Sequence, residues 1–206
     1  MTAVDKKFFS YYTSMPQVLV PLAQGFEEIE AITIIDVLRR GGIDVITATL
    51  NPVTDTRQVT GSHQITITAD TWLDQLVGNY REHNLDHDFD AIVLPGGPGT
   101  FTLRDDGRII KILKQYARAG KLTAAVCAAP VVLSAAGLLQ GKRGTSYPSV
   151  QSQLELAAYV TDAVVVDGMV VTSRGPGTVM AFALQLVAML VGENIAAQLQ
   201  RDMIVQ

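Results

Sequence analysis

The chain has 206 residues, 48% of them hydrophobic and 17% charged, so it can bury a sizeable core and is expected to fold as one domain. Its net charge is −4 and its basic residues form no run, which argues against a nucleic-acid-binding surface and a polybasic membrane patch. No apolar window of about 18 residues exists, so no membrane-spanning helix is expected. One cysteine cannot form an intrachain disulfide, which favours a reducing cytoplasm.

Residues 1–14 differ in pattern from the rest of the chain. They lack an apolar core followed by a small-residue cleavage site, so they do not have the pattern of a signal peptide. A strand-like run begins just after Met15. We therefore expect 1–14 to be an extension or leader and 15–206 to form the domain.

Short β-rich runs alternate with longer helical stretches along this domain. In chain order we expect a strand at 17–22, a helix at 27–40, a strand at 43–50, a hairpin or edge strand at 59–68, a short helix capped by Asp70 and ending at Leu76, a strand at 89–94, a helix at 105–119, a strand at 122–126, a helix beginning near Pro130, a hairpin turning at Asp167-Gly168, and a long helix from 173 to 190. This alternation predicts an α/β fold with a doubly wound, mostly parallel sheet between layers of helices.

Cys127 comes directly after the strand at 122–126 and just before a helix. Free N–H groups and the dipole at a helix N-terminus stabilise an anion, so a cysteine there is expected to be an activated thiolate. The small residues Ala128 and Ala129 allow a sharp turn, as in a nucleophile elbow. The alternative is that Cys127 is a small buried hydrophobic residue, which is common for free cysteines.

Two further features could belong to the same site. Gly96 and Gly97 also come after a strand, and their backbone N–H groups could stabilise an oxyanion near the sulfur, although paired glycines are often plain turn residues. Glu27, Glu28 and Glu30 begin the first helix. As a cluster they are interpreted as surface acids that complement the helix dipole, from which one could reach the thiol as a carboxyl of raised pKa.

Four segments at consistent spacing together resemble the ThiJ/PfpI superfamily, in the branch of parkinsonism-associated redox proteins and deglycases. They are Gly25-Phe26-Glu27-Glu28-Ile29-Glu30, Leu94-Pro95-Gly96-Gly97, Ala125-Val126-Cys127-Ala128-Ala129-Pro130 and Thr172-Ser173-Arg174-Gly175-Pro176-Gly177-Thr178. The match extends from about Gln17 to Gln200. It implies a flavodoxin-like sandwich that forms a homodimer, with the pocket near the dimer interface and with no cofactor and no metal.

The resemblance also implies roles for particular residues. Cys127 would be the nucleophile and oxidation-sensitive thiol, with Glu30 as its protonated partner. The remaining positions would shape the anion hole, line the pocket or lie at the interface: Gly96, Gly97 and Ala128 at the anion hole, Gly175 and Pro176 in a loop near the pocket, and Asp36 and Arg40 on the first helix.

The chain departs from the well-known animal relatives at two positions. Tyr147-Pro148 stands where they have histidine before proline, and His63 stands where they have an arginine that reaches the neighbouring pocket. Tyr147 could donate a hydrogen bond to substrate or form a wall of the pocket. Since no histidine lies downstream of Cys127, a Cys-His dyad is doubtful, although His63 could act from the second subunit.

The same residues separate branches of the superfamily. Ala128 replaces the histidine of peptidase-like and larger chaperone members, and the downstream His-x-Glu of amidotransferases is absent, so peptidase and glutaminase activities are disfavoured. His83 and His87 are four residues apart but lie in a polar stretch, which favours solvated surface over a metal site.

The resulting functional hypothesis is a cysteine-dependent, glutathione-independent glyoxalase or protein deglycase. It would act in the cytoplasm on methylglyoxal-type aldehydes or their glycated adducts, in oxidative and carbonyl stress defence. The alternative from another class is a redox sensor or chaperone that uses oxidation of Cys127. Family members also carry a thiamine thiazole-phosphate biosynthesis label, for which this sequence shows no phosphate-cradling motif.

Overall fold

The computed structural model describes residues 15–78 and 89–205, in which strands and helices alternate as the sequence predicts. The strands are β1 (Gln17–Leu22), β2 (Asp44–Thr49), β3 (Gln58–Thr60), β4 (Thr66–Thr68), β5 (Thr71–Trp72), β6 (Ala91–Leu94), β7 (Leu122–Val126), β8 (Arg143–Gly144), β9 (Ala158–Tyr159), β10 (Val164–Asp167) and β11 (Val170–Ser173). The α-helices are α1 (Glu28–Arg40), α2 (Leu73–Gly78), α4 (Thr100–Asp105), α5 (Gly107–Arg118), α6 (Pro130–Ala135), α7 (Val179–Val191) and α8 (Glu193–Asp202), and the 3-10 helices are η2 (Pro148–Gln153) and η3 (Pro176–Thr178).

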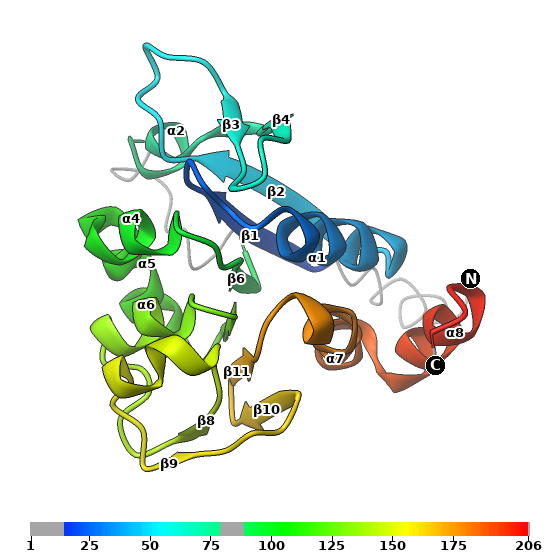
Figure 1. Cartoon of the computed structure of the whole chain (residues 1–206). Coiled ribbons are helices and arrows are strands. Elements are labelled where there is room, and N and C mark those ends of the chain that lie inside the picture. The colour runs from blue at the N-terminus through cyan, green and yellow to red at the C-terminus, as the bar shows by residue number, and fades with distance from the viewer. Residues whose placement is uncertain (1–14, 79–88, 206) are drawn as a thin grey trace, which may run out of the picture.

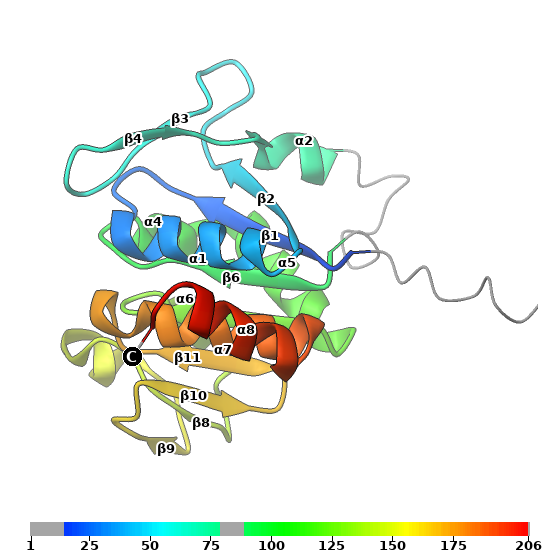
Figure 2. The ribbon, with the colours of Figure 1, turned by 90° about the vertical axis from the view of Figure 1, so that its right-hand side faces the viewer.

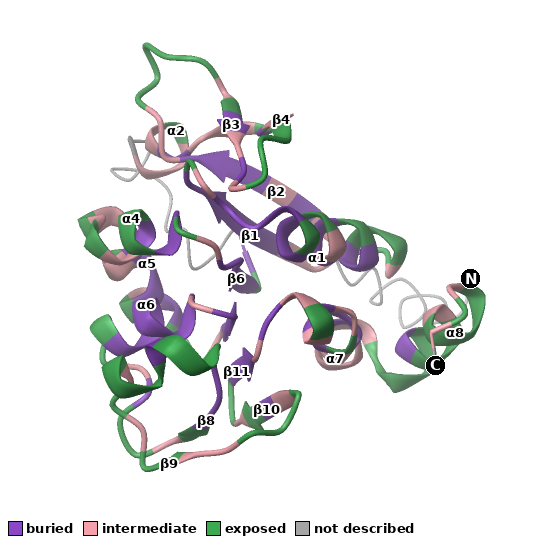
Figure 3. Ribbon diagram, viewed as in Figure 1, coloured by how far each residue is buried: buried purple, intermediate pink, exposed green. Residues whose placement is uncertain are grey.

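Seven strands form the central sheet, in the order β10-β11-β7-β6-β1-β2-β5. Neighbouring strands in this sheet pair in parallel except β10 with β11, which form the hairpin predicted at Asp167-Gly168. The middle strands β6 and β7 are buried along their whole length, because helices cover both of their faces (Figure 3). The predicted doubly wound α/β fold is therefore confirmed.

The helices lie in two layers, one on each face of the sheet (Figure 1). Helices α1 and α7 pack on one face, and α8 packs on α7 farther from the sheet (Figure 2). Helices α2, α4, α5 and α6 cover the other face. Each layer has its own apolar core against the sheet. Because β1, β2, β6 and β7 run parallel, their carboxyl ends lie at one edge of the sheet, between the two layers.

Local sequence signals explain where several helices begin and end. Asp106 caps α5 by accepting a hydrogen bond from the Arg108 N–H, and Pro130 occupies the first turn of α6, where its missing N–H costs nothing. Asp70 does not cap α2, contrary to the prediction. Its carboxylate instead accepts hydrogen bonds from Thr47 and from Arg39, and thereby ties β2 to the end of α1.

Two small two-stranded sheets lie outside the central one. The predicted hairpin at 59–68 forms β3 and β4, which pair with each other antiparallel. Strands β8 and β9 pair in parallel beyond the opposite end of the central sheet (Figure 1). Within the described residues, no helix combines the length and apolarity that crossing a membrane requires.

Candidate active site

The candidate site lies where three neighbouring strands end. Strand β6 lies between β1 and β7 in the sheet, and all three run parallel. The segment after β1 carries Glu30, the segment after β6 carries Gly96, and the segment after β7 carries Cys127. Parallel strands bring their carboxyl ends to one edge of the sheet, so these segments meet although they are far apart in the chain.

Cys127 occupies a strained elbow between β7 and α6. Its φ is +62°, a left-handed conformation that costs a non-glycine residue about 1–2 kcal/mol. Two backbone hydrogen bonds hold it there, from Cys127 N–H to the Ser173 carbonyl at 3.0 Å and from Tyr147 N–H to the Cys127 carbonyl at 2.8 Å. The residue is 9% exposed. The predicted sharp turn is therefore present, with the side chain almost enclosed.

Glu30 lies in the first turn of α1 and is completely buried. Its Oε2 accepts a hydrogen bond from the Gly96 N–H at 2.8 Å, and its Oε1 has no hydrogen-bond partner among the described residues. A Cβ on Gly96 would lie 2.6 Å from Glu30 Oε2, 2.7 Å from Cys127 Cβ and 3.2 Å from Cys127 Sγ. The absent side chain of Gly96 is what allows the carboxyl and the thiol to lie on either side of it.

Gly97 is the second glycine that the geometry requires. Its φ is +90°, and a Cβ there would lie 2.5 Å from the Glu27 nitrogen and 2.6 Å from the Gly25 carbonyl oxygen. The Gly97 and Ala128 N–H groups both lie near enough to the Cys127 sulfur to lower the pKa of its thiol. The structure therefore brings together the two residues expected to form an anion hole.

Burial and mutual repulsion govern the protonation of Glu30 and Cys127. Burial raises the pKa of Glu30 to about 7, opposed by hydrogen bonds from Gly96 and Cys127 and assisted by the charge of Glu27. Burial also raises the pKa of Cys127 to about 12 beside an ionised Glu30, whose charge and hydrogen bond add to the effect. The N–H groups of Ala128 and Gly97 lower it, but not enough to offset burial.

Position before a helix therefore does not by itself produce the low-pKa thiolate expected from the sequence. The two groups share one proton over a wide pH range, because both ionising together would place two negative charges in one enclosed site. When the proton lies on Glu30, its charge no longer opposes the thiolate. The two backbone donors then lower the pKa of Cys127 against burial alone.

Glu27 and Glu28 are buried as well, contrary to the surface interpretation of this acidic cluster. They are 8% and 5% exposed. Glu27 caps α1, its Oε2 accepting a hydrogen bond from the Glu30 N–H at 2.7 Å. The sequence reasoning missed this role, because glutamate is not among the usual N-cap residues.

Glu28 turns away from Cys127 toward the β3–β4 hairpin. His63 donates to it through its backbone N–H at 2.6 Å, and His63 Nδ1 lies 3.0 Å from Glu28 Oε2. Burial by itself would raise the pKa of Glu28, but these hydrogen bonds outweigh it and lower the pKa to about 2. A Cβ on Gly61 would lie 2.2 Å from Glu28 Oε1, so only glycine fits against this carboxylate.

A metal ion is the other partner that this cluster could take. Glu27, Glu28 and His63 offer ligand atoms within 4.8 Å of one another. An ion there would have to replace hydrogen bonds that already satisfy Glu28, so we assign these groups to docking the hairpin on α1. His83 and His87, weighed as metal ligands in the sequence, lie outside the described residues.

The remaining predicted residues fall into two groups. Gly175 is buried beside the elbow, where a Cβ would lie 3.5 Å from the Tyr147 ring and 4.0 Å from Cys127 Sγ, and Pro176 is next to it as the first residue of η3. Tyr147 is 47% exposed, and its ring lies on the same side of Gly175 as the sulfur. Asp36 and Arg40 instead form an exposed ion pair at 2.7 Å near the far end of α1, away from the elbow.

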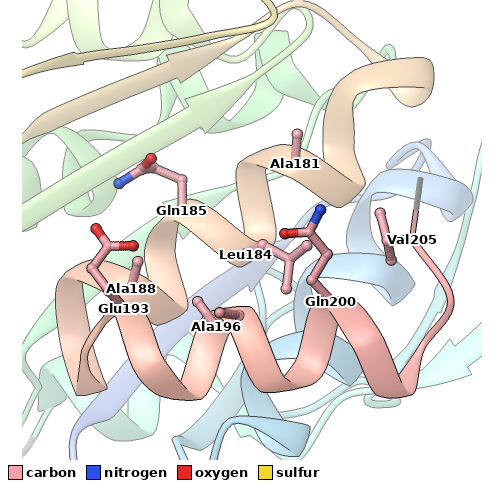
Figure 4. A pocket seen from close by; sticks show the side chains of 9 residues that line it. Ala181, Leu184, Gln185, Ala188, Glu193, Ala196, Gln200 and Val205 are labelled. Carbon is pink, nitrogen blue, oxygen red and sulfur yellow. The ribbon is translucent and has the colours of Figure 1, made fainter.

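A separate cavity of about 290 Å³ lies between α7 and α8 (Figure 4). Apolar side chains such as Ala181, Leu184 and Ala196 line it, together with the polar Gln185, Glu193 and Gln200. None of the predicted site residues lines this cavity.

The chain is similar to known proteins over most of its length. Residues 16–189 match the model of the DJ-1/PfpI family. The chain belongs to the DJ-1/PfpI family.

Individual DJ-1/PfpI relatives extend this assignment. The chain is 37% identical over 196 residues to Protein DJ-1 homolog B of Arabidopsis thaliana, covering 94% of this chain but only 42% of that longer protein. A Pyrococcus abyssi protein named as a deglycase is 35% identical over 176 residues, covering 84% of this chain and 99% of that one. The crystal structure of Drosophila melanogaster DJ-1beta superposes with a TM-score of 0.83 at 38% identity, covering 93% and 99% of the two chains.

Proposed function

We propose that the protein is a glutathione-independent glyoxalase and deglycase that acts on methylglyoxal-type aldehydes through Cys127 and Glu30. The observation that carries the proposal is the enclosed pair itself. A thiol with two converging N–H donors lies beside a buried carboxyl group that has one oxygen free of hydrogen bonds. The relative named as a deglycase supports the same reaction class.

The first step is attack of the Cys127 sulfur on the aldehyde carbon of methylglyoxal. The thiol proton passes to Glu30, a carbon–sulfur bond forms, and the carbonyl oxygen becomes an oxyanion. The Gly97 and Ala128 N–H groups stabilise the developing charge, after which a proton from Glu30 gives a hemithioacetal. A pKa of about 7 suits Glu30 to both accepting and releasing that proton.

The second step moves hydrogen between the two substrate carbons. Ionised Glu30 removes the proton from the hemithioacetal carbon to give an enediol, then returns a proton to the neighbouring carbon. The product is a lactate thioester on Cys127. Water hydrolyses it to lactate and restores the thiol, so methylglyoxal and one water become one lactate with no net oxidation. On early glycation adducts, the same chemistry would release the amine or thiol.

The experiment is lactate formation from methylglyoxal without glutathione. We compare reduced wild-type protein with Cys127→Ser, Glu30→Gln and the control Glu193→Gln, an exposed acid beginning α8. Wild type and the control should form lactate, and both site variants should lose at least about 100-fold, the effect of removing a nucleophile or general base. Loss in Cys127→Ser alone would remove Glu30 from proton transfer, and no lactate from wild type would contradict the proposal.

The same geometry supports a second function, a redox sensor or chaperone. The donors that would stabilise an oxyanion would also bind the oxygens of a sulfinate, and Glu30 could donate its proton to one of them. The chain has no second cysteine to resolve a sulfenic acid as an intrachain disulfide. Mass spectrometry after peroxide treatment tests it: sulfinate at Cys127 in a wild type that forms no lactate favours this function.

We also propose a homodimer that uses the exposed side of α1 and the hairpin. Ile29 and Ile32 on α1 are 57% and 43% exposed, and Ile65 is 56% exposed on the hairpin that Glu28 holds against α1. Light scattering should show a dimer, which Ile32→Glu should shift toward monomer. Val166→Glu is the matched control, since Val166 is equally exposed on β10. Asp36, Arg40 and His63 would form the polar part of this interface.

The proposed partners are small aldehydes or glycated adducts, with the cytoplasm as the site of action. The lone cysteine fits a reducing compartment. If the proposal holds, glutamine, peptides and thiazole phosphates should not be substrates.

A further inference from the structure

Glu27 takes part in a closed circuit of three hydrogen bonds at the start of α1. The Glu30 N–H donates to Glu27 Oε2 at 2.7 Å, and the Glu27 N–H donates to the Gly96 carbonyl at 2.9 Å. The Gly96 N–H in turn donates to Glu30 Oε2 at 2.8 Å. The circuit thus holds both the backbone N–H and the carboxyl group of Glu30 next to the loop that carries Gly96.

One hydrogen bond of this circuit is connected to the sulfur through a single peptide group. The Gly96 carbonyl and the Gly97 N–H belong to the same peptide group. The carbonyl accepts the Glu27 N–H, while the N–H at the other end donates to Cys127. Glu27 is therefore hydrogen-bonded to both groups that act on Cys127. Its side chain binds the Glu30 N–H, and its own N–H binds the peptide group that carries the Gly97 N–H.

Capping alone does not require a charged side chain here. Serine, threonine, aspartate and asparagine are the usual N-cap residues, and a neutral acceptor caps a helix well. Glu27 instead adds a carboxylate in a buried position, next to a second buried carboxyl. Such an arrangement opposes ionisation of the neighbouring acid, because like charges repel strongly where water is excluded.

We propose that Glu27 is a positioning residue whose negative charge shifts the shared proton toward Glu30 and so increases the fraction of Cys127 that is present as thiolate. The inference rests on the proposed pairing of Glu30 with Cys127. The direction follows from placement: Glu27 Oε2 accepts the Glu30 N–H at 2.7 Å, and its charge raises the pKa of Glu30. The charge that raises the pKa of Cys127 comes from Glu30.

The other titratable groups around Glu27 leave this direction unchanged. Glu28 and His63 have ligand atoms within 4.8 Å of it, but they are hydrogen-bonded to each other on the hairpin side. Beyond Glu30 lies Cys127 on the elbow, and the loop from Gly96 to Gly99 contributes only backbone groups and Pro98. Among the described contacts, no lysine or arginine forms an ion pair with Glu27.

The test measures the rate at which iodoacetamide alkylates the protein between pH 5 and 9. Because the chain has one cysteine, every alkylation event reports Cys127. Glu27→Gln removes the charge but keeps an oxygen that can cap α1. Removing a like charge worth about half to one pKa unit should lower the thiolate fraction, and hence the rate at pH 7, by about threefold to tenfold.

A second pair of variants controls for a loss of rate that comes from misfolding. Glu27→Asp and Glu27→Asn both place a good N-cap residue at this position and differ in charge, so the Asp variant should alkylate several times faster than the Asn variant. Glu193→Gln, the first acid of α8, should alkylate at the wild-type rate. Thermal midpoints of all variants show whether each one is folded.

Equal rates for wild type and Glu27→Gln, or for the Asp and Asn variants, would overturn the inference. The assay does not depend on lactate formation. A wild type that forms no lactate but slows in alkylation when Glu27 loses its charge would contradict the proposed enzyme and leave this role of Glu27 standing. A wild type that forms lactate, with an unchanged alkylation profile in Glu27→Gln, would support the proposed enzyme and contradict this role of Glu27.

Discussion

Replacing Glu30 with glutamine should stabilise the folded protein at pH 8 and leave its stability almost unchanged at pH 4. In the folded state the pKa of Glu30 is about 7, against an ordinary value of 4.5. The unfolded chain therefore releases the proton first, so Glu30 favours unfolding increasingly as pH rises from 4.5 toward 7. Each pKa unit corresponds to about 1.4 kcal/mol, which gives a destabilisation of about 3 kcal/mol at pH 8.

Urea denaturation of wild type and Glu30→Gln at several pH values measures this difference. The variant's advantage should grow between pH 4.5 and 7 and then remain constant. Glu28→Gln provides the opposite case two residues away, since the folded pKa of Glu28 is lowered to about 2. That variant should lose stability at pH 7, by about 1 kcal/mol after solvent screening near the hairpin, and the loss should vanish as pH falls from 4.5 toward 2. A Glu30→Gln advantage that is the same at pH 4 and pH 8 would refute the reasoning.

Three further variants or conditions test the geometry of the site. Gly96→Ala should abolish lactate formation and lower stability by about 1–3 kcal/mol in thermal denaturation, because its Cβ would lie 2.6 Å from Glu30 Oε2; retention of full activity would contradict this packing. Lactate formation by wild type should rise as pH increases through about 7, where the pair loses its first proton, and a flat profile between pH 6 and 8 would contradict the shared proton. Tyr147→Phe should raise KM severalfold with little change in the thermal midpoint if its hydroxyl binds substrate, whereas an unchanged KM would leave Tyr147 as a wall of the pocket.

The sequence predicted the elements that carry the site because their signals are local. Apolar runs mark β1, β6 and β7, and the residues soon after each run supply Glu30, Gly96 and Cys127. Helix α4 was missed because six residues are too few to repeat the 3.6-residue pattern of a helix, and α8 was not recognised beyond the long apolar α7.

The protonation behaviour was harder to predict because it depends on burial. Acids at a helix N-terminus are usually exposed, and only the neighbouring loops show that Glu27 and Glu28 are enclosed. The raised pKa of Cys127 depends on the carboxyl group of Glu30, which lies far earlier in the chain. Such long-range contacts leave no pattern in the residues around the elbow.

The order of strands in the sheet has a consequence for the protein during its synthesis. The elbow is held by Ser173 at the end of β11, while its acidic partner belongs to the segment after β1. A growing chain that has released Cys127 from the ribosome therefore still lacks one of the strands that fix the elbow. Until the residues up to Ser173 have also emerged, the thiol should react like any solvent-exposed cysteine. The particular reactivity of Cys127 is thus a late property, acquired only when segments from both halves of the domain have packed around the elbow.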